Sequence, residues 1–100
     1  MSTYHRIVAV KTAARILEFL AHQQTPVTGQ EVARALDLPH GTVMCHLATL
    51  DDVQFVRCVG DSYELGMKLS LFWARKKARL EAQRIRLDRA IEILTVEGGD

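Results

Sequence analysis

The chain has 100 residues, of which 48% are hydrophobic and 25% charged, and its formal net charge is +1. This is the composition of an ordinary water-soluble protein, and the length suits one compact domain with an extension. A chain this short has little room to enclose a substrate, and its serines, cysteines and histidines form no nucleophile, base and acid pattern, so we expect no enzyme.

The first expected element is a helix that follows a short N-terminal arm over residues 1–9. The arm begins with polar residues and carries no helix-capping signal. Apolar residues then recur at positions i, i+3, i+4 and i+7, namely Ala13, Ile16, Leu17 and Leu20. This spacing predicts a helix from Val10 or Lys11 to His22 that buries the stripe. We expect it to be scaffolding, with Arg15 at most touching a phosphate.

Residues 28–50 predict two short helices joined by a turn. Thr28 and Glu31 form a capping box, so a helix should begin near Gly29. It should end before Pro39, because a proline disfavours helical angles in the preceding residue and suits the first turn of a new helix.

The helix expected over residues 39–50 has one apolar and one polar face. Its apolar positions are Val43, Leu47 and Leu50. The opposite face holds His40, Gly41, Thr42, Met44, Cys45, His46 and Thr49. Two helices with so short a link form the helix-turn-helix pattern, whose second helix fits the major groove of DNA.

A β-hairpin is expected next, because residues 55–59 alternate, Gly60 and Asp61 make a tight turn, and residues 62–65 return. So short a hairpin needs helices beneath it. The predicted fold class is therefore mostly α with a small β-hairpin. It is a winged helix-turn-helix over residues 10–66, with a three-helix core and a two-stranded wing, followed by a long C-terminal helix.

The long helix is predicted over residues 67–97, where good helix formers dominate, with a glycine-containing tail over 98–100. Positive charge is concentrated here: residues 75–89 hold seven basic and two acidic residues, whereas residues 1–74 hold six and seven. Apolar residues run along one side of the helix: Leu69, Trp73, Leu80, Leu87, Ile91 and Leu94.

This apolar side predicts dimerisation, since a long helix with one apolar side rarely stays unpaired in water. Lys76, Gln83 and Ala90 occupy the companion positions, so an extended parallel zipper is not well specified. The alternative is that the first turns pack on the winged helix and the rest is solvated.

Cys45 and Cys58 are too few for a disulfide scaffold, and no cleavable signal, lipidation signal or membrane span is evident. We therefore expect a cytoplasmic protein with no membrane partner. A metal site built on His40, Cys45, His46 and Cys58 is disfavoured, because His40 and Cys45 do not stack on one helix face and no paired-cysteine motif is present. No metal and no cofactor are expected.

The residues also resemble a family, the DNA-binding domain of IclR-type bacterial transcriptional regulators, over roughly residues 8–72. The segments that carry the resemblance are Val10–Leu20, Thr28–Leu36, Leu38–Val43, Leu47–Leu50 and Tyr63–Gly66. Its more specific parts are the Pro-x-x-Thr-Val start of the second central helix and the Tyr-x-Leu-Gly end of the hairpin. The resemblance implies a dimer that binds a near-palindromic operator, with the recognition helix in the major groove and the wing near the backbone.

The sequence departs from the family pattern at three places. Met44, Cys45 and His46 stand where the family usually has an arginine or another polar contact residue. Gln54 stands where it usually has a glycine, and the wing tip carries Asp61. The family also has a larger C-terminal effector-binding domain that these residues do not match. We therefore expect no small-molecule effector, and a module of the kind that phages and mobile elements encode.

The residues expected at the DNA are Thr28, Gln30, Arg34, His40, Gly41, Thr42, Met44, Cys45, His46, Arg57 and Lys68. His40, Thr42 and His46 would hydrogen-bond base edges, and Met44 would meet a thymine methyl. Gly41, Thr28 and Gln30 would bring helix starts to phosphates, and the basic residues would bind the backbone.

Binding through the histidines would strengthen as pH falls toward about 6. The alternative for the whole set is a solvated helix face, in which Thr42 only caps its helix and Arg34 pairs with Asp37 or Glu31. The competing function is then a protein-interaction or assembly module that has lost DNA binding. Binding to heparin, and DNA binding that weakens steeply with salt, would separate the two functions.

Overall fold

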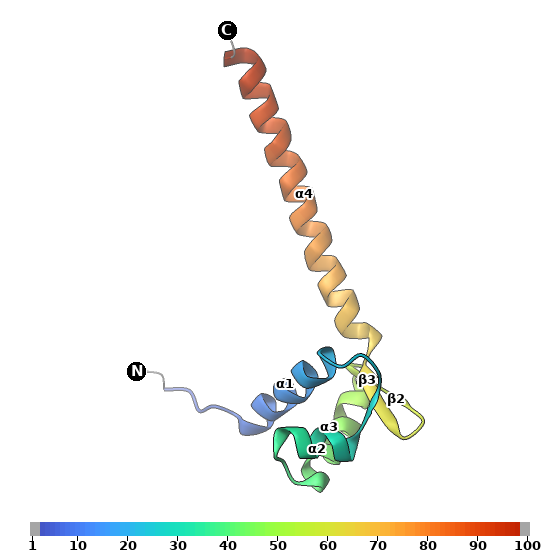
Figure 1. Ribbon diagram of the computed structural model, residues 1–100. Coiled ribbons are helices and arrows are strands. Elements are labelled where there is room, and N and C mark those ends of the chain that lie inside the picture. The colour runs from blue at the N-terminus through green and yellow to red at the C-terminus, as the bar shows by residue number, and fades with distance from the viewer. Residues whose placement is uncertain (1–2, 99–100) are drawn as a thin grey trace. The chain divides into compact units, whose positions relative to one another are not determined.

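The computed structural model describes residues 3–98 (Figure 1). Its elements are α1 (Val8–Ala21), β1 (Val27–Thr28), α2 (Gly29–Leu36), α3 (His40–Asp52), β2 (Val56–Val59), β3 (Ser62–Leu65) and α4 (Met67–Gly98). Backbone contacts divide the chain into two units, residues 1–69 and 70–100. The predicted fold class is confirmed: a helix-turn-helix and a small antiparallel sheet are followed by a long helix.

Helix α1 begins at Val8, two residues before the predicted start, so the N-terminal arm is shorter than residues 1–9. The backbone N–H groups of Val10 and Lys11 both donate to the carbonyl of Ile7, at 3.2 and 3.4 Å. The first turn therefore closes through the backbone, and no side-chain cap is needed to start it. Residues 1 and 2 of the predicted arm lie outside the described residues.

Helix α2 has the predicted capping residue. The Thr28 hydroxyl accepts a hydrogen bond from the backbone N–H of Glu31 at 3.1 Å and donates to its Oε1 at 3.2 Å. The helix ends at Asp37, which takes the left-handed conformation with φ 55°. Its buried face includes Gly29, where an added Cβ would overlap the sulfur of Met44 on α3. The absent side chain leaves room for the Met44 side chain between α2 and α3.

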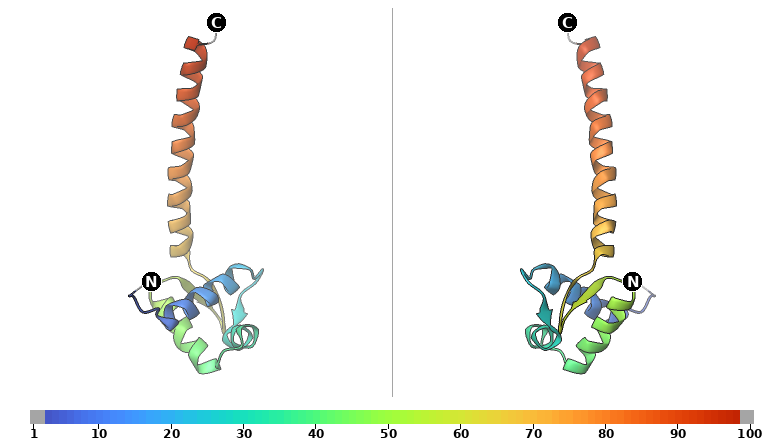
Figure 2. Two further views of the ribbon diagram at one scale, coloured as in Figure 1. Left: turned by 90° about the vertical axis from the view of Figure 1, so that its left-hand side faces the viewer. Right: turned by 90° about the vertical axis from the view of Figure 1, so that its right-hand side faces the viewer.

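The core lies where α1, α2 and α3 meet the sheet, and Figure 2 shows these helices gathered together in both views. The predicted apolar face of α3 is confirmed, because Val43 and Leu47 are fully buried and Leu50 nearly so. The buried hydrophobic residues are Ile16, Leu20, Val27, Val32, Ala33, Val43, Leu47, Leu50 and Val56. Burying the inner face of α3 fixes which of its residues point outward.

The wing contains one strand more than the sequence predicts. The hairpin of β2 and β3 pairs Val56 with Leu65 and Val59 with Ser62. Strand β1, which precedes α2, adds to the free edge of β3, so that the order is β1-β3-β2. At two residues, β1 is too short to show an alternating pattern in the sequence. Because β1 joins the hairpin to the start of α2, it ties the wing to the helix-turn-helix.

Helix α4 runs without interruption to Gly98, one residue beyond the predicted 67–97. It has 32 residues and is therefore about 48 Å long. Residue 98 of the predicted tail belongs to the helix, and residues 99 and 100 lie outside the described residues.

Gln54 occupies the turn between α3 and β2 in the left-handed conformation, with φ 66°. A side chain with a Cβ is strained there, by about 1 kcal/mol or more. We expect Gln54→Gly to raise the free energy of unfolding by about 0.5–1 kcal/mol, measured by urea denaturation. The matched control is Asp52→Gly, which should lower stability by about 1 kcal/mol because it puts a glycine in the last turn of α3. Stabilisation by neither glycine, or by both equally, would contradict this account.

Candidate nucleic-acid interface

The outward face of α3 is a stripe of small side chains. Gly41, Cys45, Ala48 and Asp52 recur at i, i+4, i+7 and i+11, so they lie on one face, and all four are exposed. They lie opposite the buried apolar face of the helix. We call these four residues the outer stripe. Ala48 was not among the predicted contact residues, although its spacing from Cys45 indicates the same face.

The first turn of α3 is open to an approaching group. Pro39 is its N-cap residue and provides no side-chain cap. The first backbone N–H groups of a helix have no partner within the helix, and they favour an anion. Gly41 has no atom within 4 Å of the position that a Cβ would take. The start of α3 can therefore come close to a phosphate or a base edge.

Three of the predicted contact residues lie on the flanks of α3. Met44 is half-buried and packs against the core beside Gly29. Thr42 is half-buried, and its carbonyl oxygen lies 2.8 Å from Nδ1 of His46. Because a carbonyl can only accept, Nδ1 of His46 must donate, which leaves Nε2 for another partner.

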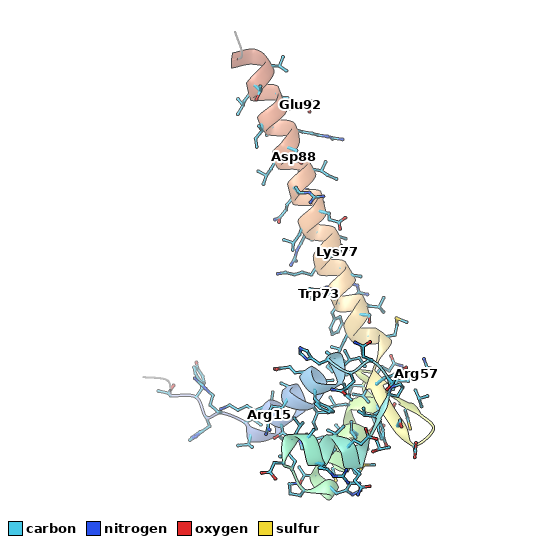
Figure 3. The ribbon with its side chains drawn as sticks, viewed as in Figure 1. Arg15, Arg57, Trp73, Lys77, Asp88 and Glu92 are labelled. Atoms are coloured by element: carbon cyan, nitrogen blue, oxygen red, sulfur yellow. The ribbon has the colours of Figure 1, made fainter. Side chains whose placement is uncertain are left out.

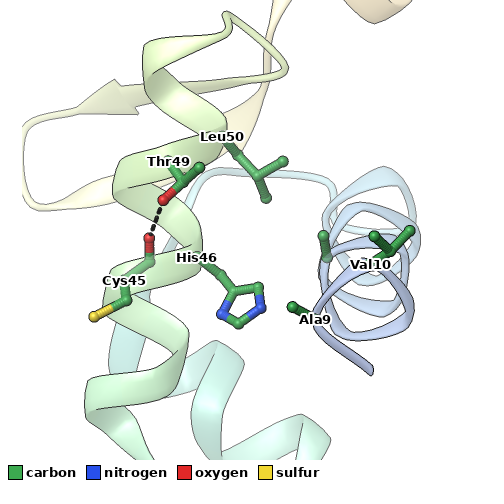
Figure 4. A pocket seen from close by; sticks show the side chains of 7 residues that line it. Ala9, Val10, Cys45, His46, Thr49 and Leu50 are labelled. Carbon is green, nitrogen blue, oxygen red and sulfur yellow. Dashed lines mark hydrogen bonds between the residues drawn. The ribbon is translucent and has the colours of Figure 1, made fainter. Parts of the chain in front are cut away.

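His46 points toward α1 and not along the outer stripe. Its ring faces Ala9 across a shallow apolar groove between the two helices (Figure 4). Val10 and Ala13 line the α1 side of this groove. The neighbouring Cys45 points away from α1, and its carbonyl oxygen accepts a hydrogen bond from Thr49 Oγ1 at 2.8 Å. His46 is therefore less accessible than Cys45.

The start of α2 offers one exposed side chain that is polar and uncharged. Gln30 is exposed, whereas both hydrogen bonds of the Thr28 hydroxyl are made to Glu31. A phosphate contact at this point would use Gln30 and the backbone, because the Thr28 side chain already has its partners.

The basic residues of the winged helix differ in how free their charges are. Arg34 and Lys68 are exposed, and within residues 3–98 neither forms an ion pair, so the predicted alternative pairing of Arg34 is not seen. Arg57 on β2 lies 3.8 Å from Glu64, its cross-strand partner on β3. Arg15 donates from Nη2 to the carbonyl oxygen of Leu36 at 3.0 Å, which holds α1 against the end of α2.

The wing contains one titratable group with a shifted pKa. Burial raises the pKa of the Tyr63 phenol above its ordinary value of 10.0, and nearby Cys58 and Asp51 raise it further. Cys58 also donates from its thiol to the carbonyl of Gly60 at 3.3 Å. The phenol therefore stays a neutral part of the hairpin near pH 7 and adds no charge to the interface.

Helix α4 exposes the apolar residues predicted for dimerisation. Trp73 is 73% exposed, Leu80 51% and Leu94 70%. Leu87 and Ile91 are exposed as well, whereas Leu69 is half-buried. Figure 3 labels Trp73 together with Lys77, Asp88 and Glu92 along this helix. Exposed apolar side chains of this number on one helix indicate a surface that another helix can cover.

The described residues also bear on metal binding and on insertion into a membrane. No three or more His, Cys, Asp or Glu side chains in residues 3–98 gather in a way that could hold a metal ion. No helix within the same residues combines the length and the apolar character needed to cross a lipid bilayer.

The fold has a helix-turn-helix whose second helix, α3, has an exposed outer face, and a wing lies beside it. These features define the class of winged helix-turn-helix DNA-binding domains. The chain belongs to the family of the IclR helix-turn-helix domain, whose sequence profile matches residues 9–60. This family is one of transcriptional regulators and not of enzymes. A comparison with curated proteins gave no match.

Solved structures agree with this assignment. An IclR transcriptional regulator from Alicyclobacillus acidocaldarius is similar over 72% of this chain, with a TM-score of 0.67 and 31% identity. The repressor BlcR from Agobacterium tumefaciens is similar over 70%, with a TM-score of 0.60 and 30% identity. An IclR-family regulator from Brucella abortus shares the fold over 68%, with a TM-score of 0.63 and 20% identity. The chain spans 30%, 28% and 26% of these three proteins.

Proposed function

We propose that this chain regulates transcription by binding double-stranded DNA as a homodimer, with α3 of each copy in the major groove of one half of a near-palindromic operator. The observation that carries the proposal is the outer stripe. Gly41, Cys45 and Ala48 are exposed on a helix whose opposite face is fully buried. The rigid core therefore presents a smooth, narrow helix surface of the size that a major groove admits.

Base reading is assigned to the first half of α3 and backbone binding to the surrounding elements. His40 and Thr42 stand at the open start of the helix, and Cys45 lies further along the outer stripe. Gln30, Arg34 and Lys68 are exposed and supply the nearest groups for phosphates. Helix α3 has no lysine or arginine, so base contacts and not charge would decide its sequence preference.

Dimerisation is assigned to α4, through the exposed side that carries Trp73, Leu80 and Leu87. A dimer matches the two-fold symmetry of a palindromic operator, since each copy then occupies one half-site.

The proposal is tested by selecting bound sequences from random DNA and titrating the selected duplex over a range of salt concentrations. With about two cations at phosphates in each copy, Arg34 and Lys68, the slope of log K against log salt should be about −4. The chain should also be retained on a heparin column and released as the salt concentration rises.

If the chain binds neither DNA nor heparin and forms stable oligomers, the result would instead support the assembly module. The bare apolar side of α4 and the lack of basic residues on α3 are the observations that favour that alternative.

Gly41→Ala separates DNA binding from folding. A Cβ at this position meets no atom within 4 Å, and alanine favours a helix, so stability should stay equal or rise by about 0.5–1 kcal/mol. If the start of α3 presses against the duplex, the added methyl group should weaken affinity for the selected DNA about tenfold, measured by fluorescence anisotropy. Ala35→Gly is the control: it removes a methyl group on the exposed side of α2, and it tests whether a change in helix stability alone alters the affinity for DNA. Unchanged affinity of the Gly41→Ala variant would contradict the assigned contact.

A further inference from the structure

We propose that three arginines of α4 bind phosphates of double-stranded DNA beside the operator half-sites. Arg75, Arg79 and Arg86 stand at i, i+4 and i+11, with Ala82 at i+7, and this spacing places them on one face of the helix. We call the three arginines the arginine row. The inference rests on the proposed function and deepens it, because it adds a DNA contact outside the helix-turn-helix and its wing.

The charges of the arginine row are unpaired within the described residues 3–98. All three arginines are exposed, and none of them forms an ion pair there. No acidic residue stands three or four positions from any of them, so no helix neighbour neutralises their charge. Arg75 and Arg79 are instead one turn apart, and like charges at this spacing destabilise a helix. An anion that covers the row would relieve this repulsion.

Other cations of α4 differ from the arginine row in this respect. Lys77 Nζ lies 3.9 Å from Glu81 Oε1, one turn further along. Three cations have an acidic residue three or four positions further along the helix, where side chains are neighbours: Lys77, Arg84 and Arg89. These three residues therefore provide a matched comparison on the same helix.

Two features of the arginine row fit the phosphate backbone of a duplex. A guanidinium group can bind two phosphate oxygens through parallel hydrogen bonds. The row extends over 11 residues, about 17 Å along the helix axis, and one DNA strand has about five phosphates in that length. Each arginine can therefore find a phosphate without reading a base.

The winged helix itself brings little positive charge to the duplex. Helix α3 has no lysine or arginine, and Arg57 on the wing lies 3.8 Å from Glu64. The arginine row begins at Arg75, six residues after Leu69, the last residue of the unit that contains the winged helix. Once α3 occupies its half-site, this short connection keeps the row at a high effective concentration near the same DNA.

The arginine row stays accessible when a second copy covers the apolar side of α4. An α-helix turns by about 100° per residue, so the row lies about 100° to 140° from Leu80. Glu81, Asp88 and Glu92 lie about 80° to 120° from Leu80 in the opposite sense. A helix that rested its apolar side on an anionic membrane would bring these carboxylates to the headgroups. The charges therefore favour a duplex over a membrane as the partner.

Two lengths of the selected duplex test the contact. One is trimmed to the two half-sites, and the other has about 15 base pairs of unrelated sequence on each side, which matches the length of α4. With about two arginines of the row at phosphates in each copy, the slope of log K against log salt should steepen from about −4 to about −7 on the long duplex. At about 0.1 M salt the long duplex should bind at least tenfold more tightly.

A triple variant of the full chain, the row variant, should lose this preference for the long duplex: Arg75→Gln, Arg79→Gln and Arg86→Gln. Glutamine suits a helix about as well as arginine does. The matched control removes the same charge from the same helix and should keep the preference: Lys77→Gln, Arg84→Gln and Arg89→Gln. Comparing the two duplex lengths within each variant separates the contact from any change in dimerisation. Circular dichroism and light scattering measure the fold and the mass of each variant.

The outcomes distinguish the inference from the function on which it rests. Loss of the preference in the row variant, and not in the control, supports the inference. Equal affinity of the unmodified chain for the two duplexes, or equal losses in the two variants, overturns the inference and leaves binding to the half-sites intact. No specific binding to either duplex overturns the proposed function itself.

A membrane is tested as the other polyanion. The probe is vesicles of phosphatidylglycerol and phosphatidylcholine, sedimented with each variant at about 0.1 M salt. We expect the unmodified chain and the row variant to stay equally in solution. If the unmodified chain binds the vesicles, the row variant does not, and no preference for the long duplex is found, the arginine row belongs to a membrane contact and the inference is overturned.

Discussion

Replacing Leu80 with glutamate should abolish the dimer at micromolar concentrations and lower affinity for a two-half-site operator by more than 100-fold. Leu80 lies in the middle of the apolar side of α4, which we call the seam, and is 51% exposed in the single chain. The exposed residues of the seam are Trp73, Leu80, Leu87, Ile91 and Leu94. In a dimer, the change removes two buried leucine side chains and puts two carboxylates in their place, at a cost of about 3 kcal/mol or more. Sedimentation velocity measures the dimer, and titration of the operator measures the consequence for DNA binding.

The matched control for this experiment is Ile85→Glu. Ile85 is also 51% exposed, but it lies about 140° around the helix from Leu80, away from the seam. The two variants therefore introduce the same charge at equally exposed apolar positions. Equal effects of the two would contradict the assignment of the seam. Binding of the Leu80→Glu variant to a single half-site should persist, because the winged helix folds around a separate core.

Gly66→Ala should lower the free energy of unfolding by about 3 kcal/mol. Gly66 is buried where β3 ends and α4 begins, and its N–H donates to the carbonyl of Phe55 at 2.8 Å. An added Cβ would overlap the carbonyl oxygen of Gln54, which is backbone and has no flexible end to move aside. The hairpin would have to shift away from the end of α3 to make room. Urea denaturation checks the loss.

Gly41→Ala serves as the control for this experiment, because it adds the same methyl group at a position with open space. Stability of the Gly66→Ala variant equal to that of the Gly41→Ala variant would contradict the close approach. The family resemblance points to Gly66 as the last residue of the Tyr-x-Leu-Gly pattern, and the structure gives the physical reason for a glycine there.

Much of the fold is predictable because its signals are local. The capping pair of Thr28 and Glu31 fixes the start of α2, and Pro39 fixes the break before α3. Strand β1 and the left-handed Gln54 are not predictable in this way. A two-residue strand exists only because β3 provides an edge, and the conformation of Gln54 is imposed by the elements on either side of it.

The candidate interface is predictable in position and less so in detail. The spacing of apolar residues identifies the buried face of α3 and therefore its outer face. It does not reveal that Met44 packs beside Gly29, that His46 turns toward α1, or that Arg57 meets Glu64. Each of these depends on a neighbour that is distant in the sequence, so only the folded chain decides how much of each side chain is left for DNA.

The sequence by itself determined the two central helices, the hairpin and the long charged helix, because capping, periodicity and turn residues act between neighbours in the chain. Only the tertiary structure decided which side chains of α3 stay free, which cations keep their charge unpaired, and why residue 66 is a glycine. These features depend on packing between separate elements, where a distance of an ångström decides the outcome and no local pattern records it.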